Sequence, residues 1–227
     1  MNDQRMGRAA FLTVLGLGTV GLAFGERITR GLSAPIGAVG DVIPNAVKAL
    51  VPTGWRIYAV NPPWPTFHPA TYRLQVTGMV ARPLTLEWTE VGGLPAVDET
   101  ADFHCVTGWT VGGVHWRGIR LQTLWDMAHP LPEARYVNFI SMEHPYVDTL
   151  SLKQTTMPQV MLAHTMDGAP LPREHGAPLR LVVPEMYGYK GVKWLHRIEL
   201  VDRLEPGYWE QRGYDVDAWV GRSNGYF

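Results

Sequence analysis

The alternation of apolar and polar residues along the chain predicts a domain built mainly from β-strands. Residues 179–183 form a short apolar run closed by Pro184, which predicts a strand buried on both faces. The dipeptide formed by Asp167 and Gly168 is a strong signal for a tight turn. Four further segments have strand character, and the period-two alternation is clearest in the first and the last: 72–78, 136–141, 160–166 and 196–201.

One stretch has the period of an amphipathic helix instead. Its apolar residues recur at positions i, i+3, i+4 and i+7, namely Leu121, Leu124, Trp125 and Ala128. The combined pattern predicts an α+β fold, with a single mainly-β mixed domain over residues 51–227. The tail from Gly207 onward is rich in aromatic residues and glycine, and we expect it to lie over the surface of this domain.

The beginning of the chain has a different character. Residues 9–25 are apolar and uncharged, and Arg5 and Arg8 precede them. A buried core helix would carry a polar face, which this run lacks. We therefore expect residues 1–30 to be a signal-like or membrane-anchor segment, and residues 31–50 to be a spacer.

The same region carries an export-like motif. The residues from Arg8 to Leu12 resemble a twin-arginine export signal in which Ala9 replaces the second arginine. We expect an exported protein, periplasmic or extracytoplasmic, that residues 9–25 could anchor in a membrane.

Composition and charge exclude several classes of protein. A hydrophobic fraction of 46% and a charged fraction of 18% are ordinary for a globular protein, so a disordered chain is excluded. The net charge is −1 and no run of basic residues occurs, so the sequence has no basic patch that could bind nucleic acid. A single cysteine excludes an intramolecular disulfide framework, a multi-cysteine zinc site, a cysteine-ligated iron–sulfur cluster and a c-type haem attachment.

That cysteine, Cys105, lies in the segment ADFHCVTGWT. Its thiolate is a natural ligand for a soft metal, whereas the simplest alternative is a small buried hydrophobic residue. A third reading is a catalytic nucleophile activated by His104, His115 or His175. The segment alone does not decide between these readings.

A second group of polar residues follows about seventy positions later. A short buried strand separates His175 and Arg180 from a basic, glycine-flanked loop that contains Gly191 and Lys193. Glycine-turn N–H groups backed by lysine and arginine suit a phosphate and the polar edge of a heterocycle. The alternative is a hydrogen-bonded histidine and two exposed basic side chains.

Taken together, these segments resemble the molybdopterin-binding domain of the sulfite oxidase family. The resemblance is closest to its haem-free bacterial branch, which includes periplasmic methionine-sulfoxide reductase catalytic subunits. The matching pieces are LQVTGMVARPLTL (74–86), FHCVTGWT (103–110), WRGI (116–119), HGAPLRLVVP (175–184) and YGYKGVKWL (187–195).

The resemblance implies a molybdenum–molybdopterin cofactor and a role for each matching residue. Cys105 would give its thiolate to molybdenum and act as the catalytic ligand, and His175 and Arg180 would hold the pterin and its phosphate. The remaining implied cofactor contacts come from Asn61, Ser141, Gly191, Val192 and Lys193.

The chemistry implied is two-electron oxo transfer by a molybdopterin-dependent oxidoreductase. Sulfite oxidases bind their oxyanion with arginines just after the cysteine, but residues 106–110 contain none. Reduction of a small S-oxide or N-oxide is therefore the favoured activity. Sulfite oxidation by the same site, and a cofactor-free exported binding domain, are the alternatives.

No haem-binding or flavin-binding pattern occurs in the sequence, so electrons would be exchanged with a separate partner, such as a membrane haem protein. We expect a small-molecule substrate, no nucleic acid and a monomer, because the extra domain through which larger relatives dimerise would not fit in 227 residues.

Overall fold

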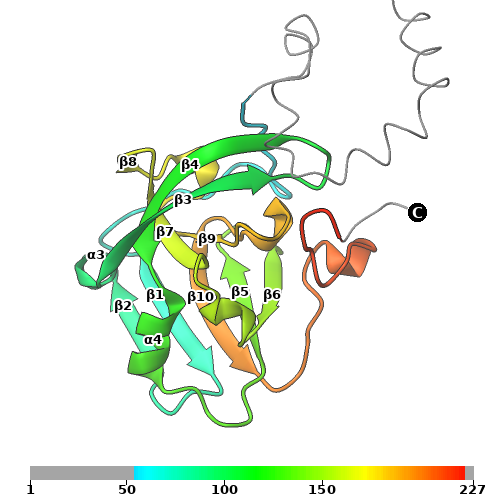
Figure 1. The fold of residues 1–227 in the computed structure, drawn as a ribbon. Helices are drawn as coiled ribbons and strands as arrows, with labels where there is room; N and C mark the ends of the chain where they lie inside the picture. Colours follow the sequence, from blue (N-terminus) through cyan, green and yellow to red (C-terminus); the bar gives the residue numbers. More distant parts are fainter. Residues whose placement is uncertain (1–53, 223–227) are drawn as a thin grey trace, which may run out of the picture. The chain divides into compact units, whose positions relative to one another are not determined.

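The computed structural model describes residues 54–222, which form two β-sheets joined by short helices and loops (Figure 1). The first sheet has the strand order β2-β1-β10-β5-β6, and the second has the order β3-β4-β7-β8, with β9 paired to β7. The strands of the first sheet are β1 (Arg73–Gly78), β2 (Leu84–Glu87), β5 (Tyr136–Ser141), β6 (Val147–Ser151) and β10 (Leu195–Val201). Those of the second are β3 (Ala96–His104), β4 (Thr110–Ile119), β7 (Met161–Met166), β8 (Ala169–Pro170) and β9 (Arg180–Val182).

The helices of the described residues are short. They are α3 (Trp88–Gly93), α4 (Leu121–Ala128) and the 3-10 turns η2 (Gln154–Thr156), η3 (Arg173–His175), η4 (Gly188–Lys190) and η5 (Glu210–Arg212). None of the helices within residues 54–222 has the length and apolar character needed to cross a membrane.

Strand β10, the last strand of the domain, pairs with the first strand, β1, and with β5. It pairs in parallel with β1, where Val76 faces Ile198, and antiparallel with β5, where Phe139 faces Ile198. All three of these side chains are fully buried in the main hydrophobic core. The first and the last strand of the domain are therefore neighbours in the middle of one sheet.

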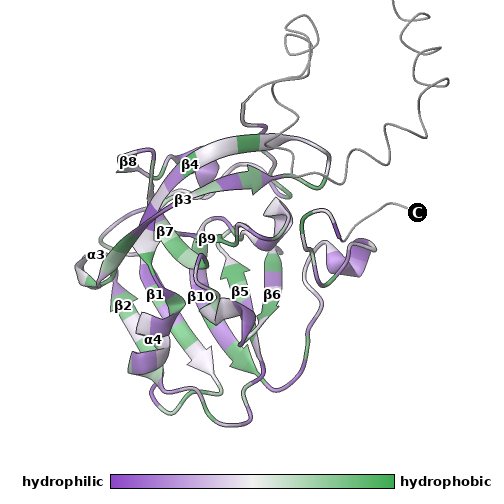
Figure 2. Cartoon of the chain, in the orientation of Figure 1, coloured by the Kyte–Doolittle hydropathy of each residue, from purple (hydrophilic) through white to green (hydrophobic). Residues whose placement is uncertain are grey.

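The hydropathy pattern predicted helix α4 and five of the ten strands, namely β1, β5, β7, β9 and β10. Leu74 and Val76 are the buried positions of β1, and polar positions interleave with apolar ones along the strands (Figure 2). The helical spacing is also confirmed, because all four of its apolar residues are buried in α4. The turn at Asp167 and Gly168 has positive φ at both residues and connects β7 to β8.

The α+β, mainly-β fold is thus confirmed, whereas the N-terminal segments 1–30 and 31–50 lie outside the described residues. The pattern did not predict β3 and β4, the two long strands on either side of Cys105. Only Ala101 is buried among the nine residues of β3, so the strand has no regular apolar face to recognise.

Candidate active site

The thiol of Cys105 lies in the connection between β3 and β4. Strand β3 ends at His104, and the Cys105 N–H donates a hydrogen bond to the Trp109 carbonyl at 2.9 Å. Gly108, with φ of +89°, closes the turn by donating to the Cys105 carbonyl at 3.0 Å. The Sγ atom is 3.2 Å from Thr107 Oγ1 and is partly exposed. A hydrogen-bonded turn therefore fixes the position of the sulfur.

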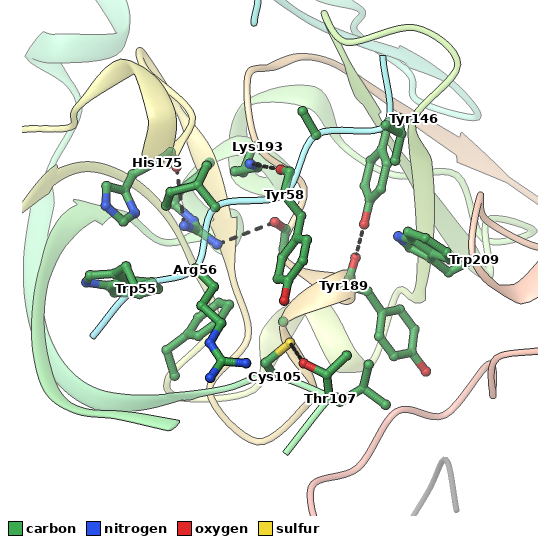
Figure 3. Close-up of a pocket in the computed structure, with 18 of the residues that line it drawn as sticks. Trp55, Arg56, Tyr58, Cys105, Thr107, Tyr146, His175, Tyr189, Lys193 and Trp209 are labelled. Carbon is green, nitrogen blue, oxygen red and sulfur yellow. Dashed lines mark hydrogen bonds between the residues drawn. The ribbon is translucent and has the colours of Figure 1, made fainter. Parts of the chain in front are cut away.

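This sulfur faces a cavity of about 460 Å³, and most of the residues predicted for the site line that cavity (Figure 3). Segments from β3–β4, η3, β9 and the loop after η4 meet there. Five of the eight predicted residues line it, namely Cys105, His175, Arg180, Gly191 and Lys193. The fold thus brings together two sequence segments that are about seventy residues apart.

Arg180 is a buried cation without a carboxylate partner among residues 54–222. Its residue is 3% exposed, and its guanidinium donates to the His175 carbonyl at 3.2 Å and to the Gly191 carbonyl at 3.5 Å. The Nε atom has no hydrogen-bond partner in the described chain. Burial lowers the pKa of Arg180 to about 10, which leaves it charged at neutral pH. A buried charge of this kind favours an anionic ligand.

Lys193 is a second cation on the same cavity. Its ammonium donates to the Tyr58 carbonyl at 2.5 Å and to the Glu174 carbonyl at 3.4 Å (Figure 3). Burial, and then the charge of Arg180, lower the pKa of Lys193 to about 8. The charge of Glu143 opposes these two effects but does not offset them.

His175 is neutral at pH 7. Burial, followed by the charge of Arg180, lowers its pKa to about 4. Its ring packs edge-on against Trp55, with 4.6 Å between the ring centroids. An uncharged imidazole can donate through one nitrogen and accept through the other, which suits a heterocycle with mixed donors and acceptors.

Gly191 lines the cavity at a point of close packing against β9. A Cβ atom at this position would lie 3.0 Å from the Leu181 carbonyl oxygen and 3.2 Å from Arg180 Nη2. Val192, next to it, is fully buried and does not line the cavity. Its N–H donates to the Lys190 carbonyl and its own carbonyl accepts from Leu181, so both backbone groups are engaged within the fold.

Ser141 and Asn61 lie behind the cavity wall. The Ser141 hydroxyl donates to the Lys193 carbonyl at 2.7 Å and accepts from the Glu143 N–H at 2.9 Å. The Asn61 side chain donates to the His144 carbonyl at 2.8 Å. In this structure both residues support the loops around the cavity without lining it.

Sequence reasoning missed two segments that line the cavity. The first runs from Trp55 to Val60 and places Arg56 and Tyr58 beside Cys105 (Figure 3). Exposed and partly buried residues alternate along it in the structure, but it contains no regular helix or strand. The second is the aromatic tail, expected on the surface, which instead contributes Tyr208, Trp209 and Tyr214 to the cavity.

Comparison with known families decides the identity of this domain. Residues 61–209 match the family described as the oxidoreductase molybdopterin binding domain. The protein belongs to that family. The matched range contains all eight predicted site residues.

This molybdopterin-binding domain has relatives among bacterial oxidoreductases. It is 36% identical over 70% of its length to MsrP of Gluconobacter oxydans, a protein-methionine-sulfoxide reductase catalytic subunit, and covers 56% of that protein. It is 36% identical over 65% of its length to the uncharacterized oxidoreductase YuiH of Bacillus subtilis, and covers 75% of it. The sulfane dehydrogenase SoxCD from Paracoccus pantotrophus superposes with a TM-score of 0.56 and 26% identity, over 61% of this chain and 40% of that chain.

The cavity residues fit the cofactor for which the molybdopterin-binding family is named. A thiol, the two cations Arg180 and Lys193 and a neutral imidazole surround one space. The unpartnered Nε of Arg180 supplies a donor for a phosphate oxygen, and the cysteine sulfur suits a soft metal.

Proposed function

We propose that this cavity holds a molybdenum–molybdopterin cofactor through Cys105 and the cations Arg180 and Lys193, and that the domain catalyses two-electron oxo transfer. The observation that carries the proposal is the combination of a fixed thiol with Arg180 and Lys193, which have no carboxylate partner within residues 54–222. A structural thiol or a nucleophilic cysteine would need neither cation.

Each residue has a distinct task in this proposal. Cys105 supplies the protein sulfur to the metal, and Arg180 and Lys193 neutralise the phosphate. His175, uncharged, orients the pterin by hydrogen bonding, while Ser141 and Asn61 keep the surrounding loops in place. When bound, the cofactor supplies the two-electron redox chemistry; the chain supplies binding, orientation and a shaped cavity.

A small neutral S-oxide or N-oxide is the substrate class that the cavity supports best. Arg117 and Arg120 follow Cys105 in the sequence, but neither lines the cavity. Arg117 pairs with Asp98, and Arg120 pairs with Glu99 at 2.9 Å. These guanidinium groups are therefore already engaged elsewhere. Similarity to a methionine-sulfoxide reductase catalytic subunit supports the same substrate class.

Sulfite oxidation is the second candidate, and one residue favours it. Arg56 lines the cavity beside Cys105 and is exposed, so its guanidinium is available to an oxyanion (Figure 3). Replacing Arg56 by methionine separates the two activities. It should abolish most sulfite turnover if sulfite is the substrate, and should leave S-oxide turnover within about twofold.

The proposal includes an exported location and a separate electron partner, for instance a membrane haem protein. These rest on the sequence of residues 1–30 and on the lack of haem- and flavin-binding patterns. A small-molecule substrate, no binding to nucleic acid and a monomeric state complete it.

The deciding experiment measures metal content. The full chain is expressed in a host that makes the molybdenum cofactor, and molybdenum and pterin are determined per chain. We expect about one of each, with loss of molybdenum binding in Cys105→Ser and full retention in the control Lys153→Met, which changes an exposed residue. A folded chain without molybdenum would contradict the proposal.

Turnover then identifies the direction of the reaction. Reduction of dimethyl sulfoxide and trimethylamine N-oxide by a reduced viologen dye is compared with oxidation of sulfite by ferricyanide. Faster turnover of sulfite would favour sulfite oxidation over the reduction of an S-oxide or N-oxide.

A further inference from the structure

A fully buried ion cluster lies next to the cavity without lining it. Lys190 is held between Asp148 Oδ1, at 2.5 Å, and Glu210 Oε1, and it also donates to the Thr149 carbonyl at 2.7 Å. The three charged side chains are 1%, 1% and 2% exposed. They come from η4, β6 and η5, which are distant in the sequence.

The cluster binds its lysine tightly. Burial alone would lower the pKa of Lys190, but the charges of Asp148 and Glu210 more than offset it and raise the pKa above its usual value. Burial also raises the pKa of Asp148 to about 8, against the opposing effect of Lys190. The ammonium therefore stays charged, held between a carboxylate of β6 and one of the C-terminal segment.

Glu210 holds that segment, residues 207–214, in place against the rest of the domain. The second carboxylate oxygen of Glu210 accepts from the Gly207 N–H, and the Tyr208 N–H donates to the Val147 carbonyl at 2.8 Å. Gly207 approaches β6 so closely that a Cβ atom would lie 2.9 Å from the Val147 oxygen. The carboxylate therefore fixes both the ion cluster and the start of the segment.

Each member of the cluster lies within two residues of an aromatic residue in the cavity lining. The aromatic wall consists of Tyr146, Tyr189, Tyr208, Trp209 and Tyr214. Its rings form one continuous chain, with centroid separations of 5.6 Å for Tyr146–Tyr208, 5.2 Å for Tyr208–Trp209, 5.1 Å for Trp209–Tyr214 and 5.3 Å for Tyr189–Tyr214.

We propose that Lys190, acting through Glu210, is a positioning residue that holds the aromatic wall in place and so limits the size of the molecules that reach Cys105. Lys190 touches neither the cavity nor the sulfur. The inference deepens the proposed function by assigning substrate size selection to residues 207–214, but the wall and its anchor exist whether or not the cavity holds a metal.

The first test measures amide hydrogen exchange in residues 207–214 of the full chain. Glu210→Ala removes the carboxylate while leaving Lys190 paired with Asp148, and exchange of these amides should accelerate at least tenfold. Glu210→Gln keeps the side-chain shape but has one acceptor oxygen for two donors, Lys190 and the Gly207 N–H, so its exchange should lie between that of the wild type and that of Glu210→Ala. Glu133→Ala, which changes an exposed glutamate elsewhere, is the matched control. Unchanged exchange in Glu210→Ala would overturn the anchoring role.

The second test measures access to the cavity. In the molybdenum-loaded chain, the ratio of kcat/KM for dimethyl sulfoxide to that for methyl phenyl sulfoxide should fall about tenfold in Glu210→Ala, mainly through the KM of the larger compound. In a chain without molybdenum or without activity, alkylation of the single cysteine by iodoacetamide and by N-phenylmaleimide gives the same comparison. A faster-exchanging segment with unchanged size discrimination would overturn the proposal.

A milder variant covers the case in which Glu210→Ala does not fold. Glu210→Asp keeps the charge, but its shorter side chain cannot reach both Lys190 and the Gly207 N–H. We expect a loss of size discrimination of about threefold, and discrimination equal to the wild type would count against the anchor. Because exchange and alkylation do not require turnover, the failure of this inference is separable from the failure of the proposed function.

Discussion

Arg180 illustrates how a single residue can favour ligand binding at the expense of folding. Its charge is buried with two carbonyl contacts and an unpartnered Nε, and no carboxylate within residues 54–222 neutralises it. Such a group is costly to bury until an anion binds. Replacing Arg180 by an apolar residue should therefore raise the stability of the cofactor-free domain and lower its affinity for the cofactor.

Arg180→Met tests this trade-off. Replacing an unpaired buried charge by an apolar side chain should stabilise the cofactor-free chain by about 1–2 kcal/mol. The same substitution should lower the molybdenum and pterin content at least tenfold. Urea unfolding and metal analysis give the two quantities, with the exposed Arg203→Met as control. Loss of both stability and cofactor would instead show a structural role.

His175 makes a prediction about pH. Its pKa falls from 6.5 to about 4 on folding, because burial and Arg180 disfavour the charged ring. Lys193 acts in the same direction, and Glu174 and Asp167 oppose it. The folded state therefore prefers the neutral form, so the stability that His175 contributes above pH 6.5 is lost as the pH falls to about 4.

His175→Asn removes this titration. Between pH 7.5 and pH 4.5 the variant should lose about 1–2 kcal/mol less unfolding free energy than the wild type. Denaturant titrations of the cofactor-free chain at several pH values measure the difference. Parallel pH profiles for the two proteins would show that the ring does not titrate in this window.

The sequence predicted some residues of the cavity lining and missed others. Cys105, His175, Arg180 and Lys193 stand in segments whose residue types already indicate a cofactor site, and the fold brings them to one cavity. Arg56 was missed because an exposed arginine in an irregular segment resembles any solvated side chain. Nothing in its neighbourhood shows that the segment folds back against the β3–β4 turn.

At the scale of elements, the contact between η4 and β3 governs the shape of the cavity. Gly188, in η4, has no room for a side chain, since a Cβ atom there would lie 2.2 Å from the ring of Phe103. Phe103 is two residues before Cys105 and packs on Trp55 at 4.8 Å. Displacing this ring would disturb the wall next to the sulfur.

Gly188→Ala should therefore destabilise the domain by about 1–3 kcal/mol through overpacking and should lower cofactor content. Gly92→Ala is the matched control, because nothing lies within 4 Å of the added Cβ atom in helix α3. The control should gain about 0.5–1 kcal/mol from the better helix former. Thermal or urea unfolding distinguishes them, and equal effects from the two alanines would contradict the packing argument.

Elements were predictable where apolar residues recur with a regular spacing, and were missed where glycines or polar residues interrupt that spacing, as in β4 and β6. Helix α4 and strands β1 and β10 have regular buried positions, so their apolar spacing is visible in the sequence. Strand β3 is a long partner of β4 with mostly exposed or half-buried residues. Its pairing is decided by backbone hydrogen bonds to β4, which leave no mark on the residue pattern.

At the scale of the whole molecule, the central position of β10 makes folding dependent on residues late in the chain. Strand β10 lies between β1 and β5, with β2 and β6 at the edges of the same sheet. A chain lacking β10 would leave two separate strand pairs and expose a large part of the core.

Two truncations test this dependence. A chain that ends at residue 192 should show no cooperative urea unfolding, because the first sheet cannot form. A chain that ends at residue 206 retains both sheets and should unfold cooperatively with reduced stability, since Lys190 then keeps only Asp148. Circular dichroism and urea titration follow both, and cooperative unfolding of the shorter chain would show that β10 is dispensable.

The parallel pairing of β1 with β10 also sets an order of events during biosynthesis. The ribosome makes β1 and its neighbour β2 early, but the second neighbour of β1, β10, is made only near the end of the domain. The last cavity residues, up to Tyr214, are made later still. A nascent chain consequently offers no finished receptacle for a prosthetic group. The binding cavity is therefore complete only once residues 207–214 have been made and have packed against β6.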